Sequence, residues 1–173
     1  LLRFTWLLLL FLQTAACFPQ KAMDLYPVSL GGKWGYIDKQ GHIVIGMKYE
    51  HASFDLYKTL NVVTDSKGYM LIDNADKPLT GDHYQSLLHS YGTRFISVQD
   101  STGLWGCIDT TGKLVIPYQY AESIYFSGGI ASVKKNGVPG YYDLDLHFRS
   151  LEGFDDVYAA NEGFMIVTNG TGK

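Results

Sequence analysis

One nine-residue pattern recurs along this chain at a fixed interval, and this recurrence restricts the fold more than any other feature. Segment 33–41, KWGYIDKQG, returns at 104–112 as LWGCIDTTG. Weaker copies surround two further aspartates, so that the anchor residues Asp38, Asp73, Asp109 and Asp143 lie 35, 36 and 34 residues apart. A period of this length predicts a tandem array in which each unit buries the face of its neighbour.

Two other positions keep the same period. An aromatic residue stands eleven positions after each anchor, and a valine closes an apolar run 24 or 25 positions after it. The aromatic residues are Tyr49, Tyr84, Tyr120 and Phe154, and the valines are Val63, Val98, Val133 and Val167.

Each unit is predicted to hold three antiparallel strands. In a strand over residues 34–38, successive side chains would point to opposite faces, and those on each face are mostly apolar or small. This favours a strand that is covered on both faces. An Asp followed three residues later by Gly, at 38–41 and 109–112, indicates a tight hairpin turn. A returning strand at 43–45 or 114–116 should stop at Gly46 or Pro117. An irregular link with aromatic residues and a Val-ended strand complete the unit.

The fold class is therefore all-β, in a solenoid-like or a propeller-like array. About 35 residues are few for a four-stranded blade, although a strand from the preceding unit would complete one. The array spans 24–173, with a partial unit at 24–30 and units at 33–66, 67–100, 104–136 and 138–169. The array stops in the middle of a unit at Lys173, so we expect either that the natural protein continues or that the reading frame is truncated.

Two of the units depart from the pattern. The second has Tyr69-Met70 in place of Trp-Gly, and Asp76 stands where the turn glycine belongs. The fourth has Pro139-Gly140, and Leu146 stands at the turn position. The sequence does not assign the turns of these two units.

The N-terminal residues indicate export. Arg3, an apolar run at 4–12 and Thr14-Ala15-Ala16 have the order of a signal peptide over 1–16, followed by a tether at 17–23. The run is too short to span a membrane, which takes roughly 20 apolar residues. Cys17 after two alanines resembles a bacterial lipobox, in which the cysteine is acylated, although Thr14 replaces the usual aliphatic residue. Simple secretion is the alternative.

Composition excludes some other classes. With 46% hydrophobic residues the chain is too apolar for a disordered protein, and a net charge of -3 gives no footprint for nucleic acid. Cys107 is the second of two cysteines, so no disulfide framework is implied, and we expect a small buried thiol there.

The pattern resembles the bacterial WG-repeat (KWG) family. The resemblance rests on Lys33 to Asp38 with Gly41, and on Trp105-Gly106, Ile108-Asp109 and Gly112 with Val115-Ile116-Pro117, and it covers residues from about 25 to the end. It implies a β-rich interaction module and no reaction.

Few residues suggest chemistry. Trp34 and Trp105 are interpreted as core residues beside a glycine that gives clearance, and the alternative is a binding platform. The anchor aspartates are interpreted as turn formers and not as metal ligands, because they are one repeat apart. The five histidines show no ligand spacing, and there is no GxSxG element. We therefore expect no enzyme, metal or cofactor.

Six tyrosines exceed what the strand pattern requires: Tyr57, Tyr91, Tyr118, Tyr125, Tyr141 and Tyr158. They are interpreted as half-buried residues that pack between units, and the alternative is that they stack on sugars or peptides. We expect an envelope-anchored module that binds an unknown protein partner, or alternatively cell-wall carbohydrate such as peptidoglycan. It would contact the membrane only through a lipid on Cys17, and its oligomeric state is open.

Overall fold

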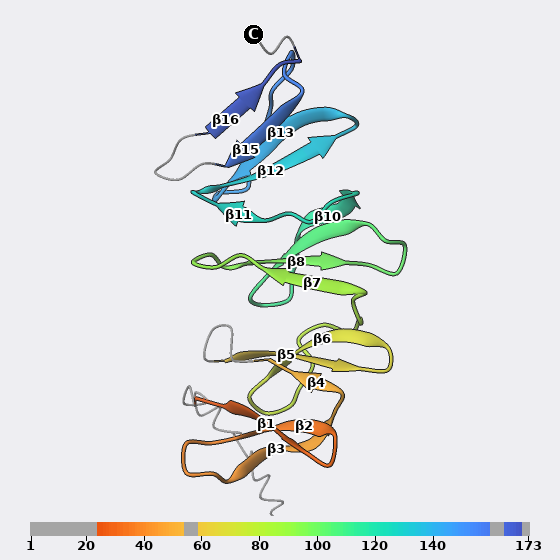
Figure 1. Cartoon of the computed structure of the whole chain (residues 1–173), viewed down its shortest axis with the longest axis vertical. Helices are drawn as coiled ribbons and strands as arrows, with labels where there is room; N and C mark the ends of the chain where they lie inside the picture. The colour runs from red at the N-terminus through yellow and green to blue at the C-terminus, as the bar shows by residue number, and fades with distance from the viewer. Residues whose placement is uncertain (1–23, 54–58, 160–164, 171–173) are drawn as a thin grey trace, which may run out of the picture.

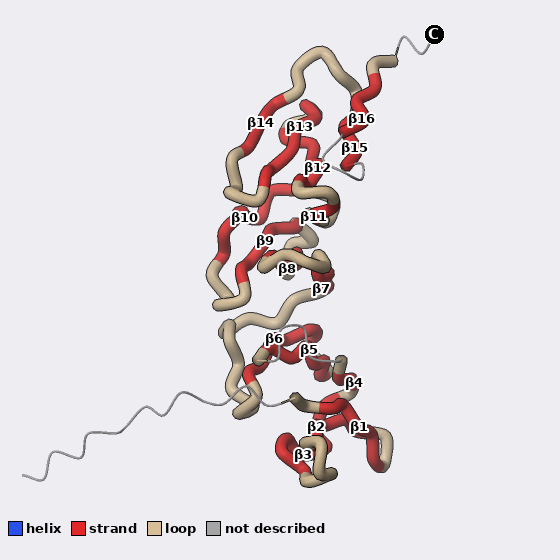
Figure 2. The backbone as a smooth tube through the Cα atoms, turned by 90° about the vertical axis from the view of Figure 1, so that its left-hand side faces the viewer, coloured by secondary structure: helices blue, strands red, loops and turns tan. Residues whose placement is uncertain are grey.

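The chain forms a column of small antiparallel sheets stacked along its long axis (Figure 1). The structure is a computed structural model that describes residues 24–53, 59–159 and 165–170. All regular structure in these residues is β-strand, as Figure 2 shows. None of them lies in a helix long and apolar enough to cross a membrane. The predicted signal peptide, the tether and Cys17 lie outside the described residues.

Sixteen strands are described. In chain order they are β1 (Tyr26–Leu30), β2 (Lys33–Ile37), β3 (Ile43–Tyr49), β4 (His51–Ala52), β5 (Leu60–Asp65), β6 (Gly68–Asp73), β7 (Ser86–His89), β8 (Phe95–Gln99), β9 (Trp105–Asp109), β10 (Leu114–Tyr120), β11 (Phe126–Ser127), β12 (Ile130–Lys135), β13 (Val138–Asp143), β14 (Phe148–Ser150), β15 (Asp156–Ala159) and β16 (Met165–Thr168).

The sheets are out of phase with the sequence repeats. The orders are β1-β2-β3 in the first sheet, β4-β5-β6 in the second, β7 to β10 in the third, β11 to β14 in the fourth and β15-β16 in the fifth. In each of the first four, the Val-ended strand of one unit pairs with the Trp-Gly strand of the next. The prediction that a preceding unit lends a strand is confirmed, and β1 is the strand at 24–30.

The link between units holds a short strand that the sequence did not reveal. β4 and β11 have two residues each and pair with the Val-ended strand that follows them. β7 and β15 take the same place in the third and fifth sheets. The complete sheets, the third and fourth, therefore have four strands. The fold is the predicted all-β array, and it forms an open stack.

The returning strand is longer than predicted. It does not stop at Gly46 or Pro117 but runs on to Tyr49 and Tyr120 through a bulge. Trp34 pairs with Tyr49 while Tyr36 pairs with Ile45, so β3 has two more residues than β2 between these pairs. β9 and β10 repeat this register shift in the third unit. The extra residues bend the strand across the Trp-Gly strand.

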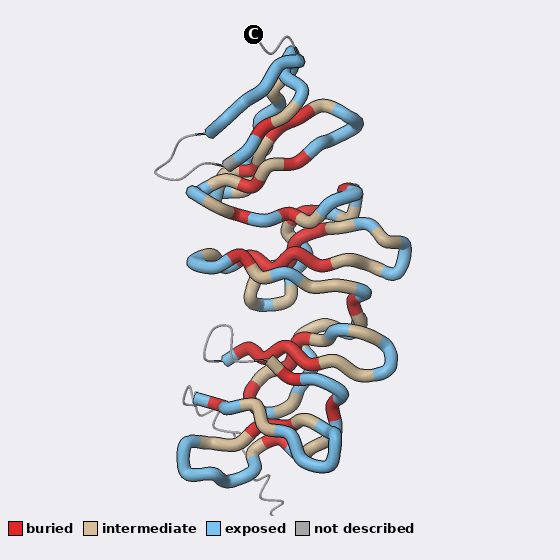
Figure 3. Tube along the Cα trace, in the orientation of Figure 1, coloured by how far each residue is buried: buried red, intermediate tan, exposed pale blue. Residues whose placement is uncertain are grey.

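The two faces of the sheets have constant roles in the stack. The front face carries the residue two before the anchor (Tyr36, Leu71 or Cys107), and the back face carries the residue just before the anchor (Ile72, Ile108 or Tyr142). Three apolar clusters each join the front of one sheet to the back of the next. The buried runs in Figure 3 follow these strands, and the hairpin tips are exposed.

The back face of the first sheet differs. Ile37 is only half-buried, whereas Ile72 and Ile108, at the same position, are 0% and 1% exposed. The expectation that strand 34–38 is covered on both faces is therefore wrong for the first unit, since no described sheet precedes it.

Serine side chains hold the third and fourth sheets together. Ser90 Oγ accepts a hydrogen bond from the Phe126 amide at 2.9 Å, and Ser97 Oγ accepts one from the Ile124 amide at 2.9 Å. Both serines are buried, and both bonds satisfy backbone groups that the stacking removes from water.

Candidate functional site

The anchor aspartates form one kind of turn in all four units. Asp38 Oδ1 accepts hydrogen bonds from the amides of Gln40 and His42, both at 2.9 Å. Asp73, Asp109 and Asp143 make the same pair of bonds two and four residues on. The interpretation of these residues as turn formers is thus supported by geometry.

The turns that the sequence did not assign are also of this kind. Asp76 and Leu146 have φ values of 65°, and Gly41 and Gly112, at the same position, have 86° and 84°. A side chain in this left-handed region costs roughly 1–2 kcal/mol. The anchor's two hydrogen bonds hold the chain in the turn without the glycine.

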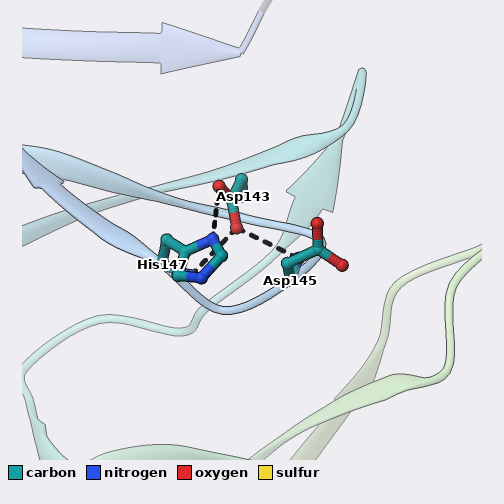
Figure 4. A group of neighbouring side chains, drawn as sticks. All are labelled: Asp143, Asp145 and His147. Carbon is teal, nitrogen blue, oxygen red and sulfur yellow. Dashed lines mark hydrogen bonds and ion pairs between the residues drawn. The ribbon is translucent and has the colours of Figure 1, made fainter.

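Asp143, Asp145 and His147 gather at the β13–β14 turn (Figure 4). Their possible ligand atoms lie within 4.8 Å of one another, and Asp145 and His147 are exposed. His147 Nδ1 is 3.3 Å from Asp143 Oδ2. The hydrogen bonds that Asp143 accepts, above all from the His147 amide, lower its pKa.

The same turn in other units explains this group without a metal. His42 Nδ1 is 3.1 Å from Asp38 Oδ2, and the corresponding positions in the second and third units hold Lys77 and Lys113. A lysine ammonium cannot ligate a metal, but it can lie beside a carboxylate as an imidazolium does. The group is therefore a turn aspartate with a basic neighbour.

The two tryptophans are less buried than expected for core residues. Trp34 and Trp105 are half-buried and pack against the edges of two apolar clusters. Trp34 also meets His51 edge to face, with 5.1 Å between ring centroids. Trp34 therefore lies at the border between the first and second sheets, and Trp105 at the border between the third and fourth.

The glycine beside each tryptophan gives clearance, as predicted, and the structure shows that the returning strand occupies the space. A Cβ on Gly35 would lie 2.4 Å from the Ile45 carbonyl oxygen and 2.7 Å from Met47 Sδ. A Cβ on Gly106 would lie 2.8 Å from the Ile116 oxygen and 2.9 Å from a ring carbon of Tyr118. The bulge of the returning strand therefore crosses directly over the glycine.

Tyr118 is consequently part of the repeat and not a free link residue. Its ring covers Gly106 and lies beside the same cavity as Tyr84, which is buried. Burial, with the effect of Tyr84, raises the pKa of Tyr118 to about 12. A cavity of about 420 Å³ lies beside it, lined by Asp82, His83, Tyr84, Asp100, Ser101 and Tyr118.

The other predicted tyrosines fall into three groups. Tyr91, Tyr125 and Tyr158 are exposed, by 81%, 40% and 52% of their surface. Tyr141 is half-buried. Tyr57 lies outside the described residues.

Two of the exposed tyrosines, Tyr91 and Tyr125, belong to successive units and lie at the junction between the third and fourth sheets. Tyr91 follows Ser90, and Tyr125 precedes Phe126, and these two neighbours are joined by the Ser90–Phe126 hydrogen bond. Because Ser90 and Phe126 are buried, the adjoining tyrosines are directed outward. His89 meets Tyr91 edge to face, with 5.1 Å between ring centroids.

A cleft of about 600 Å³ borders this junction. It is lined by segment 92–95, by Thr59 and by the tips of two hairpins, at Thr110 and at Leu144-Asp145. Arg94 lies over the Phe95 ring, 5.3 Å from its centroid, and forms no ion pair within residues 24–53, 59–159 and 165–170. We call Tyr91, Arg94, Tyr125, Leu144 and Asp145 the edge surface. The sequence singled out its tyrosines but gave no sign of the cleft, which forms from four separate segments.

Cys107 is fully buried in the third sheet. Burial raises the pKa of its thiol to about 12, so it is protonated and unreactive at neutral pH. The predicted role as a small buried residue is in keeping with this position.

Comparison with known proteins identifies the repeats. The model of the WG-containing repeat family matches residues 34–55 and 105–138, and both matches begin at the tryptophan. A comparison with curated proteins gave no match. The solved structure "KlHsv2 with loop 6CD replaced by a Gly-Ser linker" is similar at 11% identity and a TM-score of 0.39, over 68% of this chain. The chain spans 44% of that protein, and so weak a likeness carries no argument about function. The two matched segments share the Trp-Gly strand, the aspartate turn and the bulge, and they are WG-containing repeats.

Proposed function

We propose that the chain is a non-enzymatic repeat module that binds a protein partner through the edge surface. The observation that supports this most is that exposed Tyr91 and Tyr125 flank the Ser90–Phe126 hydrogen bond. Three residues after Tyr91, Arg94 lines a cleft of about 600 Å³ and has no ion pair among the described residues. Tyrosine and arginine are the residue types that dominate the energetics of protein interfaces.

The charges in the cleft indicate what a partner would present. Arg94 and Asp145 both line the cleft, and no ion pair joins them. A peptide segment with a carboxylate for Arg94 and an ammonium or guanidinium for Asp145 would pair both.

The test uses the full chain with a C-terminal tag to capture cross-linked proteins from envelope extract, followed by titration of the purified candidate. Arg94→Glu should weaken binding by at least about tenfold, which is the effect of about 1.4 kcal/mol. Arg149→Glu is the matched control, because Arg149 is exposed on β14 and does not line the cleft. Equal weakening by both variants would contradict the proposal.

Carbohydrate binding is the second candidate, and the exposed rings of Tyr91 and Tyr125 favour it. Aromatic side chains offer flat apolar faces on which a sugar ring can stack. Binding of the chain to purified cell wall that is lost in Tyr91→Ala but kept in Arg94→Glu would favour this candidate over a protein partner. Tyr118 is a poor probe because its ring already packs over Gly106.

We also propose that the chain is exported and anchored to the cell envelope by a lipid on Cys17. This proposal rests on segment 1–17 of the sequence alone. A fatty-acid analogue should label the chain and fail to label Cys17→Ser. Equal labelling of both, or of neither, would exclude lipidation and leave secretion as the alternative.

A further inference from the structure

The cavity beside Tyr118 lies at the junction between the second and third sheets. Its volume is about 420 Å³, and it shares no lining residue with the cleft beside Arg94. Three separate segments line it: the link at Asp82, His83 and Tyr84, the β8–β9 turn at Asp100 and Ser101, and Tyr118 on the bulge of β10. It is therefore a site of its own, distinct from the edge surface.

Two tyrosines form the apolar part of this cavity. Tyr84 and Tyr118 both pack in the apolar cluster that joins the second sheet to the third. Tyr84 is 3% exposed, whereas Asp82 and Ser101 are exposed. The tyrosines therefore form the floor of the cavity, and Asp82 and Ser101 lie where it opens to solvent.

The charged part of the lining is acidic. Asp82 and Asp100 contribute carboxylates, and no lysine or arginine lines the cavity. Neither carboxylate forms an ion pair within the part of the chain that the structure describes. The one basic group of the lining, His83, already has its Nε2 3.0 Å from Asp65 Oδ2. A bound group would thus meet two negative charges that no cation of the lining offsets.

The corresponding turns of the neighbouring sheets are not acidic in this way. Asp65 has the place in the β5–β6 turn that Asp100 has in the β8–β9 turn, and the His83 ring is its partner. In the β12–β13 turn the same place holds Lys135. In the third sheet the bulge brings Tyr118, which carries no charge, to the cavity with Asp100. Among these three turns, only that of the third sheet has a carboxylate without a basic partner.

We propose that this cavity binds an organic cation, namely an ammonium or guanidinium group on an alkyl stem. The carboxylates would pair with the charge, and the tyrosine rings attract a cation at their faces and cover the alkyl carbons. A metal ion fits less well, because three ligand atoms of the described residues gather only at Asp143, Asp145 and His147. Lysine and arginine side chains of a partner protein carry the required group, and so do small free amines.

The test is two-dimensional nuclear magnetic resonance of the full chain, with the backbone amides of Tyr84, Ser101 and Tyr118 as reporters. Lysine and arginine, each blocked as the N-acetyl methylamide, should cause saturable shifts of these amides. Blocked norleucine, which has the lysine stem without the ammonium, should cause none. Butylamine carries the ammonium without a peptide backbone. Tighter binding of butylamine than of blocked lysine would identify small amines as the ligand, and weaker binding would identify a basic side chain of a partner.

Two variants each remove one negative charge from the cavity. Asp82→Asn changes an exposed side chain, and Asp100→Asn keeps an oxygen for the amides of Thr102 and Leu104, so folding should be unaffected. Each should weaken binding by at least about fivefold, the effect of one ion pair at 4 Å even in bulk water. Glu152→Gln is the matched control. Glu152 is exposed and stands nine residues after its anchor, as Asp82 does, but lies outside the cavity.

Three outcomes would overturn the proposal. The first is the absence of saturable shifts with every cationic probe, or equal shifts with blocked norleucine. The second is unchanged binding in either aspartate variant. The third is equal weakening by Glu152→Gln, which would show that the overall charge of the chain, and not this cavity, attracts the cation.

Discussion

The hydroxyl of Tyr49 donates a hydrogen bond to Oδ1 of Asp76 at 2.5 Å, so that the first unit is tied to the turn of the second. Asp76 stands where the repeat has glycine and has a φ of 65°. Its other oxygen pairs with Lys48. Tyr49 is 5% exposed, and burial together with Asp76 raises its pKa. The strained turn residue thus provides the partner that a buried hydroxyl requires.

Two substitutions of Asp76 distinguish the contribution of its hydrogen bond with Tyr49 from the cost of its positive φ. Asp76→Ala leaves the Tyr49 hydroxyl without this acceptor and keeps a side chain at positive φ, and it should destabilise the chain by about 1–3 kcal/mol. Asp76→Gly also loses the bond but relieves the backbone, so it should be about 1 kcal/mol more stable than the alanine variant. Urea unfolding monitored by tryptophan fluorescence measures both, and an alanine variant as stable as the glycine variant would show that the turn is unstrained.

The glycine of the Trp-Gly strand should not tolerate a methyl group. In Gly35→Ala the new Cβ would lie 2.4 Å from a backbone oxygen of the bulge, which has to move. We expect a loss of about 1–3 kcal/mol in unfolding free energy. Gly46→Ala is the control, because nothing lies within 4 Å of its added Cβ, and its effect should be within about 1 kcal/mol. Similar losses in the two variants would mean that the bulge does not cross over Gly35.

Acid should weaken the fold through the turn aspartates. Backbone and side-chain hydrogen bonds lower the pKa values of Asp38 and Asp143, and hydrogen bonds from Thr111 and Lys113 outweigh burial in lowering that of Asp109. A carboxylate with a lowered folded-state pKa contributes stability that is complete above its unfolded value of about 3.9 and is lost as pH falls through the folded value.

The free energy of unfolding should therefore be constant above about pH 5 and fall below about pH 4. Asp109→Asn keeps an oxygen that can accept both amide bonds but does not titrate. It should have a shallower acid slope than the unchanged chain, measured by urea unfolding between pH 3 and pH 7. An unchanged slope would remove Asp109 from this role.

The Cys107 thiol should be unreactive until the chain unfolds. Its side chain is fully buried, and burial raises its pKa to about 12. In a Cys17→Ser background, which removes the other thiol, we expect no reaction with a thiol reagent at pH 8 in the native state. One thiol per chain should react in denaturant. Rapid labelling without denaturant would show that the junction between the third and fourth sheets opens readily.

Much of the fold was predictable because the features that set it recur. Asp38 and Gly41 marked the hairpin, and Val98 and Val133 marked the strand that leads into the next unit. The sequence did not reveal β4 and β11, because two residues are too few for an alternation of apolar and polar side chains. The bulge was also missed. Gly46 and Pro117 normally end pairing, whereas here they lie inside a strand that bends over Gly35 and Gly106.

The candidate site was less predictable than the fold. The sequence selected Tyr91 and Tyr125 by composition but gave no reason to join them. Their association depends on the Ser90–Phe126 hydrogen bond, which spans 36 residues and has no pattern of its own. The sequence did not distinguish Tyr118 from the exposed tyrosines, because its contact with Gly106 depends on the bulge. The sequence did not single out Arg94, because its possible role depends on the cleft, which residues of other units complete.

The offset between repeats and sheets has a consequence for how such a chain can change its length. A cut anywhere in the sequence, followed by gain or loss of one whole period, again places a Val-ended strand before a Trp-Gly strand. In the rejoined chain these two strands, now from units that were not adjacent before, can form the same backbone hydrogen bonds as in an ordinary sheet. Columns of different heights can therefore arise by simple duplication or deletion of the gene segment, with no new strand pairing to be devised at the join.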